Sequence, residues 1–224
     1  PLKPKNLVMM NVPVDKGPGQ IQWMPSPANQ IPAVGFTCKP QFYRPFSVST
    51  EMYAYEGKHM YVDTAGGGKN GDETVAAVTY FLHGYIFLAE ILKLEGGYSD
   101  ANYQAISELA FRHGVNQIDV EKNFGFGAFA SNWRPILLNY YQTMGKTGCP
   151  PIEDVWESGQ KELRIIDTLE PIMARHRLIV NESIIEYDQE SIRKYPIDIQ
   201  QTYSFFHQMC KISVDKGSRR SETY

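Results

Sequence analysis

Apolar and polar positions alternate most clearly between residues 58 and 91, and this alternation predicts β-strands. The first strand ends at Asp63, and the next two span residues 75–80 and 85–91. His83-Gly84 supplies the turn between the second and third strands. These segments predict a meander of three strands.

A helical period replaces the alternation after residue 99. Ser99 or Asp100 can cap a helix that ends at Arg112 or His113, and Gly114 can stop it. The remaining pattern predicts, in chain order, a strand ending at Glu121, a helix over residues 133–141, a strand over 152–156, a helix over 159–173 that Pro171 should bend or end early, a strand over 177–180 and an apolar segment over 203–212. Three strands followed by alternating helices and strands are typical of an α/β fold with a mixed sheet.

Composition divides the chain into two expected parts. Residues 1–57 are rich in Pro, Gln, Asn and aromatic residues without a sustained period, so we expect an irregular N-terminal arm or linker there. Residues 58–224 form the expected domain, and a chain of 224 residues with 42% hydrophobic content can bury a full core.

Charge and cysteine usage exclude several classes of protein. The net charge of -3 gives no global signature of nucleic-acid binding, so any DNA contact must come from a local patch. The three cysteines have no C-x-x-C pair, which argues against a disulfide framework or a zinc site and fits a reducing cytosol. No apolar run is long enough to span a membrane, so no membrane partner is expected.

Two acidic residues, Asp63 and Glu121, end predicted strands and are followed at once by glycine-rich turns. Each alone is more often a turn-forming residue, but on neighbouring strands the pair could hold one or two divalent ions, because Mg²⁺ prefers carboxylate oxygens. Asp72, in the turn after Asp63, offers a further acid, and Asp119 shares the sheet face of Glu121. The sequence therefore predicts a metal site at the rim of the sheet.

Other site chemistries fail on their motifs. Gly66-Gly-Gly-Lys69 lacks the Ser or Thr of a phosphate loop, and the segment before Gly145-Lys-Thr147 lacks its first glycine, so no nucleotide is expected in this chain. The histidines lack the spacing of zinc hydrolases, and there is no G-x-S-x-G motif.

Basic residues cluster in and after the predicted helix over 159–173. Lys161 and Arg164 lie three residues apart on one side of it, and Arg175 and Arg177 follow. Such residues are most often simply solvated, but near a carboxylate cluster they could hold a phosphate backbone.

Together these segments resemble the nuclease domain of the large terminase subunit of short-tailed bacteriophages, the DNA-packaging motor. The likeness runs from about residue 58 to about residue 217. It is carried by Tyr61-Val-Asp63 with its turn through Asp72-Glu-Thr, Gly97-Tyr-Ser-Asp100, Val120-Glu121-Lys-Asn-Phe-Gly125, Gly159-Gln-Lys-Glu162, Thr168-Leu-Glu-Pro171 and His176-Arg-Leu178.

The resemblance implies an RNase H-like fold and metal-dependent endonuclease cleavage of concatemeric double-stranded viral DNA. Asp63 and Glu121 would be catalytic metal ligands for two Mg²⁺ or Mn²⁺ ions, with Asp72 as an accessory catalytic acid. Further expectations are an ATPase domain upstream in the same polypeptide, the portal and small terminase subunit as partners, and a location in the host cytoplasm. The candidate DNA-binding residues are Lys69, Lys122, Asn123, Lys161, Arg164, Arg175 and Arg177.

One part of the family pattern is missing. The family has its third metal-binding acid in a motif just beyond a Lys-Gly pair, but here Lys216-Gly217 is followed by Ser-Arg-Arg-Ser-Glu-Thr-Tyr224. The third acid lies outside this sequence, or Asp215 or Glu222 replaces it, or the site has only two acids. We favour the first, because two carboxylates would bind metal weakly. The alternative function is a non-catalytic docking module that binds DNA, the portal or the small subunit.

Overall fold

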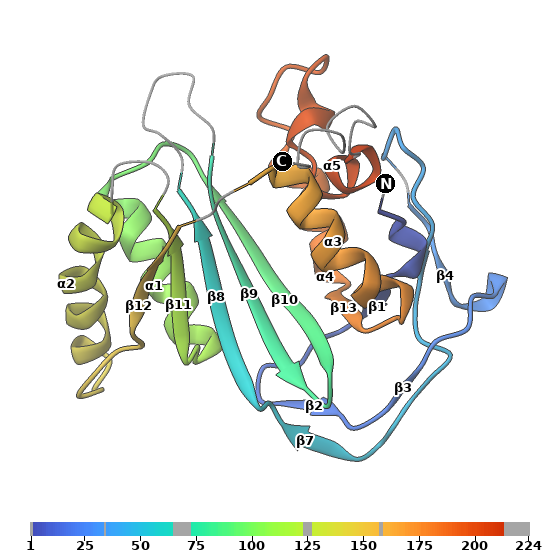
Figure 1. Cartoon of the computed structure of the whole chain (residues 1–224), viewed down its shortest axis with the longest axis horizontal. Helices are drawn as coiled ribbons and strands as arrows, with labels where there is room; N and C mark the ends of the chain where they lie inside the picture. The colour runs from blue at the N-terminus through green and yellow to red at the C-terminus, as the bar shows by residue number, and fades with distance from the viewer. Residues whose placement is uncertain (1, 34, 65–72, 123–126, 157–158, 213–224) are drawn as a thin grey trace, which may run out of the picture. The chain divides into compact units, whose positions relative to one another are not determined.

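The structure is a computed structural model that describes residues 2–33, 35–64, 73–122, 127–156 and 159–212 (Figure 1). The chain forms two compact units. The central unit comprises Val12–Gly17 and Met52–Glu157, and the terminal unit comprises Pro1–Asn11, Pro18–Glu51 and Ser158–Tyr224. The predicted boundary between an arm and a domain near residue 57 stays a prediction.

The central unit contains a mixed sheet with the strand order β12-β11-β8-β9-β10. β8, β9 and β10 are antiparallel neighbours, whereas β11 runs parallel to both β8 and β12. The bounds are β8 (Gly57–Asp63), β9 (Thr74–Leu82), β10 (Tyr85–Leu94), β11 (Gln117–Glu121) and β12 (Ile152–Val155), with β2 (Lys16–Pro18) and β7 (Met52–Ala54) paired separately. The mixed sheet predicted from the sequence is confirmed.

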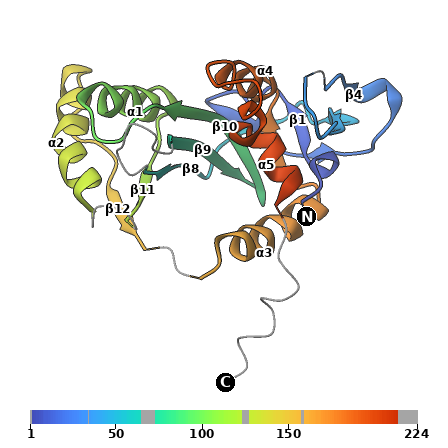
Figure 2. The same cartoon turned by 90° about the horizontal axis from the view of Figure 1, so that it is seen from above.

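Helices α1 (Asp100–His113) and α2 (Ala128–Thr143) cover one face of this sheet (Figure 2). The predicted ends of α1 are confirmed: the Ser99 hydroxyl accepts from the Asn102 N–H, and Gly114 ends the helix with a φ of 61°. α2 begins five residues before the predicted start at Trp133, and the fully buried Trp133 anchors it by donating its Nε1–H to Ser107. No helix in the described ranges is long and apolar enough to cross a membrane.

The terminal unit pairs the start of the chain with a late strand. β1 (Val8–Met10) runs parallel to β13 (Leu178–Asn181), and the strand order from there is β13-β1-β5-β4. The first 57 residues thus contain short strands in a segment that the sequence led us to expect as irregular. The other bounds are η1 (Pro4–Asn6), β3 (Ile21–Gln22), η2 (Pro27–Asn29), β4 (Gln30–Ile31), β5 (Phe42–Tyr43), β6 (Ser47–Val48), α3 (Lys161–Ala174), α4 (Ser183–Ser191), η4 (Gln200–Tyr203) and α5 (Phe205–Lys211).

Two helices of the terminal unit differ from the sequence prediction. α3 continues three residues beyond Pro171, which therefore does not end it early. α5 is held by Asp188, a carboxylate only 1% exposed, which accepts hydrogen bonds from the Ser204 hydroxyl (2.8 Å) and from the N–H groups of Phe205 (2.8 Å) and Phe206 (3.1 Å). This acid satisfies the free donors at the start of the helix.

A polar network joins β9, β10 and α1 inside the central unit. The Tyr80 hydroxyl lies against His113 Nδ1, and His113 Nε2 lies 2.8 Å from a Glu90 oxygen that also accepts from Arg112 (2.7 Å). Burial raises the pKa of Tyr80, so its hydroxyl keeps its proton. His113 thus joins Tyr80 to Glu90, with one ring nitrogen against each partner.

The network makes stability depend on pH through Glu90. Burial alone would raise the pKa of Glu90, but hydrogen bonds and charge from His113 and Arg112 outweigh it and lower the pKa to about 2. A depressed carboxyl pKa stabilises the fold above the unfolded value of about 4.5, and this contribution is lost as the pH falls toward 2. Because the side chain is 32% exposed, we expect a loss of about 1–2 kcal/mol.

The measurement is urea denaturation of the wild type and of Glu90→Gln between about pH 5 and pH 2. The wild type should lose more unfolding free energy over this range than the variant, which lacks the titrating group. Parallel profiles for the two proteins would contradict the assignment.

Candidate functional site

Asp63 and Glu121 lie side by side at the carboxyl edge of the central sheet. β8 and β11 are parallel neighbours with Val62 opposite Val120, so the next residue on each strand, Asp63 and Glu121, share one level. Val62 and Val120 are buried against the helices, and alternation directs the two acids to the other face. Neighbouring strands are about 4.8 Å apart, so both carboxylates can reach one ion between them. We call this pair the acid rim.

Backbone contacts fix the chain where it leaves the two strands. The Thr64 hydroxyl, on a residue only 7% exposed, donates to the carbonyl oxygen of Glu121 (3.2 Å). On the other side, the Lys122 N–H donates to the carbonyl oxygen of Val155 (2.9 Å). Each acid is thereby followed by a residue tied to a neighbouring strand, which limits the directions that the acids can take.

More polar side chains lie below the acid rim on the same face, with Asp119 two residues before Glu121, and His59 and Gln117 four residues before Asp63 and Glu121. His59 Nε2 is 3.0 Å from one oxygen of Asp119, and Gln117 Nε2 donates to the other (3.0 Å). Asp119 is therefore engaged by neighbours on β8 and β11. This position suits a supporting residue rather than a further metal ligand.

Lys93 shares the level of the acid rim, and sequence reasoning missed it. Asp63 pairs with Val75, and Val75 pairs with Lys93, so Lys93 is two strand spacings, about 10 Å, from Asp63 on the same face. A β-bulge between Leu88 and Glu90 produces this register. Without the extra residue, Lys93 would point to the helix-covered face. The apolar run from Tyr85 carries no alternation that could have revealed the shift.

The donor set fits part of a site for a hard divalent cation. Mg²⁺ and Mn²⁺ prefer carboxylate oxygens, and Mg²⁺ keeps several waters, so Asp63 and Glu121 can supply two protein ligands. Over the ranges that the structure describes, no group of three or more His, Cys, Asp or Glu residues is placed to hold a metal. The predicted accessory acid Asp72 and the third-acid candidates Asp215 and Glu222 lie outside those ranges.

The predicted DNA-binding residues divide between the two units. Lys122 follows the acid rim directly. The terminal unit holds Lys161 and Arg164 on α3, three residues apart, and Arg175 and Arg177 follow the helix. Lys69 and Asn123 lie outside the described residues.

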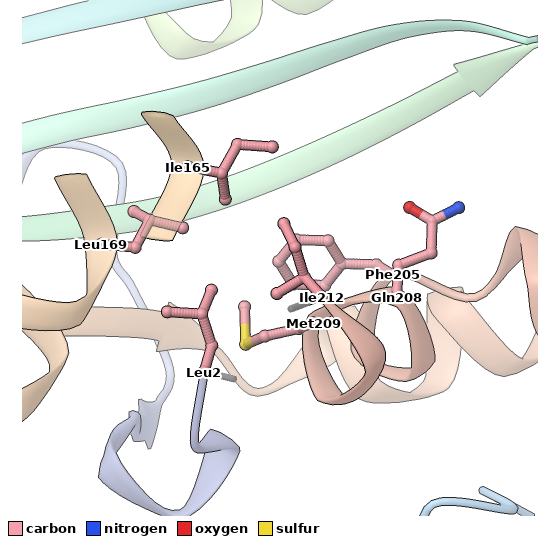
Figure 3. A pocket seen from close by; sticks show the side chains of 7 residues that line it. All are labelled: Leu2, Ile165, Leu169, Phe205, Gln208, Met209 and Ile212. Atoms are coloured by element: carbon pink, nitrogen blue, oxygen red, sulfur yellow. The ribbon is translucent and has the colours of Figure 1, made fainter. Parts of the chain in front are cut away.

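An apolar pocket of about 140 Å³ in the terminal unit does not offer an alternative active site (Figure 3). Side chains from α3, α5 and the N-terminal segment point into it (Figure 3). The described residues that line it are Leu2, Ile165, Leu169, Phe205, Gln208, Met209 and Ile212. None of these side chains is an acid, a base or a nucleophile.

Sequence and structure comparisons identify relatives of the chain. Residues 62–178 match the family described as "Terminase Bacteriophage T7, Ribonuclease H-like domain". The large terminase subunit of Enterobacteria phage T3 is 31% identical over 221 residues, which cover 97% of this chain and 36% of that protein. The chain thus spans about a third of the length of that relative.

Solved structures of terminases are also similar. The large terminase nuclease of the thermophilic phage G20c has a TM-score of 0.38 and 16% identity, covering 59% of this chain and 62% of that one. The Mn-soaked human cytomegalovirus terminase nuclease domain has a TM-score of 0.43 and 13% identity, covering 71% of this chain and 87% of that one.

The family match covers more than half of the chain and includes both acids of the rim. It agrees with the mixed sheet and with the predicted RNase H-like α/β class. The chain belongs to the ribonuclease H-like domain family of the bacteriophage T7 terminase.

Proposed function

We propose that this chain is the endonuclease domain of a phage terminase large subunit and cuts concatemeric double-stranded DNA by two-metal-ion hydrolysis. The observation that carries the proposal is the position of Asp63 and Glu121 at one level on adjacent parallel strands. Membership of the terminase family supports DNA as the substrate.

In this proposal the residues of the acid rim hold the metal and orient it. Asp63 and Glu121 are the protein ligands, and Thr64 fixes the backbone of Glu121 through its 3.2 Å hydrogen bond. Divalent ions, when bound, lower the pKa of an attacking water and stabilise the leaving oxygen. Lys93 and Lys122 supply positive charge to hold the phosphate next to the acids.

The remaining expectations extend the same proposal. Asp72 is an accessory acid, and Lys69, Asn123, Lys161, Arg164, Arg175 and Arg177 contact the DNA backbone. The nuclease domain spans residues 58–224, with the preceding residues as its connection to an upstream ATPase domain. The portal and the small terminase subunit are partners of the whole packaging protein in the host cytoplasm.

Plasmid cleavage tests the proposal. Incubating supercoiled plasmid with the chain and Mn²⁺ should give nicked and then linear DNA, because one site cuts one strand at a time. EDTA should abolish both products. Absence of cleavage by protein that is shown to bind Mn²⁺ would contradict the endonuclease assignment.

A second candidate function is a docking module that binds DNA, the portal or the small subunit without cutting. It is favoured by the lack of the family's third-acid motif after Lys216-Gly217 and by the net charge of -3. Calorimetric titration with Mn²⁺ separates the two candidates. No binding at millimolar Mn²⁺ would leave docking as the better account.

Replacing Lys93 tests the role of its positive charge, which lies on the same face of the sheet as the acid rim. We expect Lys93→Met to lower the rate of Mn²⁺-dependent nicking by about tenfold to a hundredfold, because a cation that stabilises the reacting phosphate is lost. Lys93→Arg should retain more activity, and the affinity for Mn²⁺ should not fall in either variant. A Lys93→Met protein with the wild-type nicking rate would exclude this role.

A further inference from the structure

An open pocket of about 280 Å³ in the terminal unit is bordered by lysines from separate segments. Lys3 and Lys5 come from the start of the chain, and Lys39 comes from the loop before β5. Cys38 and Cys210 lie in the same wall. No acidic residue is among the described residues that line it. We call this site the lysine pocket.

The first pair of lysines projects from an anchored backbone. Leu2 and Pro4 are buried, whereas the residue that follows each of them, Lys3 and Lys5, is exposed. The short helix η1 is closed by hydrogen bonds from the Asn6 N–H to Lys3 and from the following residue to Pro4. The two charges are therefore displayed by a fixed segment rather than by a free chain end.

Lys39 is held in a turn on the facing loop. Its backbone has a φ of 46°, and its N–H donates to the carbonyl oxygen of Phe36 (3.2 Å). Phe36 is 5% exposed, and Pro40 is also buried, so buried residues fix the turn on both sides. The left-handed backbone and the buried flanks set the direction of an exposed Lys39.

Among the described residues, no acid pairs with the charges of the lysine pocket. Within the described part of the chain, Lys3, Lys5 and Lys39 form no ion pair. Lys211, at the end of α5, adds positive charge beside Cys210. Several like charges around one hollow repel each other unless an anion enters, and an ammonium group is a good partner for phosphate oxygens.

We propose that the lysine pocket binds phosphate groups of a DNA backbone. The choice of DNA rests on the proposed function, whereas the phosphate chemistry rests on the pocket itself. The pocket lies in the terminal unit and Asp63 and Glu121 in the central unit, so it adds a binding contact and not a second cleavage centre.

Binding is measured in EDTA, where no cleavage occurs, with a short DNA duplex and increasing salt. Each lysine that neutralises a phosphate adds about one to the slope of log affinity against log salt concentration. Lys5→Gln/Lys39→Gln should therefore lower the slope by about two. The control Lys16→Gln/Lys146→Gln removes the same charge from exposed positions of the central unit and should leave the slope nearly unchanged.

The reactivity of the cysteines in the pocket wall reports on binding at the pocket itself. It is measured in a Cys149→Ser variant, which removes the cysteine outside the pocket. Burial, reinforced by a hydrogen bond with Cys38, raises the pKa of Cys210 to about 12, so Cys38 is the thiol expected to react. A dianionic aromatic disulfide should label Cys38 more slowly in Lys5→Gln/Lys39→Gln, by about fivefold, whereas a neutral disulfide should not distinguish the proteins. DNA duplex should protect Cys38 from the neutral reagent.

Equal slope changes in the two double variants, or no protection of Cys38 by duplex, would overturn the proposal. Protection by inorganic phosphate without protection by duplex would identify free phosphate as the ligand and would also overturn the assignment to DNA. These results do not depend on cleavage. If the acid rim proves inactive, the proposed function fails while the binding result stands.

Discussion

Asp63→Asn is expected to lower the rate of Mn²⁺-dependent plasmid nicking by about a hundredfold or more. The amide keeps the size of the side chain but removes a negative charge that would hold the metal beside Glu121. Since the ion must both activate water and stabilise the leaving oxygen, loss of one ligand affects the whole reaction. The same variant should bind Mn²⁺ more weakly in a calorimetric titration.

Asp154→Asn is the matched control for this change. Asp154 sits on β12 opposite Val120, so it faces the helix-covered side of the sheet and lies 3.4 Å from Arg134. The Asp154→Asn variant removes the same negative charge near the same end of the sheet, but from the other face. We expect nicking within about twofold of the wild type. Equal nicking by Asp63→Asn and Asp154→Asn would contradict a role for the acid rim.

Asp188→Ala is expected to lower the free energy of unfolding by about 3 kcal/mol. The variant leaves the Ser204 hydroxyl and the N–H groups of Phe205 and Phe206 without their acceptor, and two of these bonds cap α5. Because the site is buried, water cannot replace the carboxylate without opening the packing around Phe206. Urea denaturation measures the change.

Two further variants distinguish the loss of the helix cap from the loss of a negative charge as the cause of the lower stability. Asp188→Asn keeps an oxygen acceptor and should be less destabilising than Asp188→Ala. Asp198→Ala removes an exposed acid from the same unit and should change stability by less than about 0.5 kcal/mol. A loss below about 1 kcal/mol for Asp188→Ala would show that α5 does not depend on the cap.

Local sequence signals predicted much of the central unit. Ser99 and Gly114 mark the ends of α1 because capping and a left-handed stop depend on the residues at those positions. The alternation around Met60 and Val62 predicted β8 because one face of the strand is buried. The strand-end positions of Asp63 and Glu121 followed from the same pattern, and the parallel register places them at one level.

Features set by distant parts of the chain could not be predicted in the same way. The pairing of β1 with β13 joins residues such as Val8 and Ile179, and a three-residue strand has no period to detect. Asp188 caps a helix that begins seventeen residues later, beyond the reach of local capping rules. Lys93 reaches the level of the acid rim only through a bulge, which an unbroken apolar run conceals.

The most direct test of the acid rim is a crystal structure of the chain soaked in Mn²⁺, with anomalous scattering used to locate the metal. We predict a peak between the carboxylates of Asp63 and Glu121, within coordination distance of both, and its loss in Asp63→Asn. Mn²⁺ bound elsewhere on the chain, with no peak at the acid rim, would contradict the account.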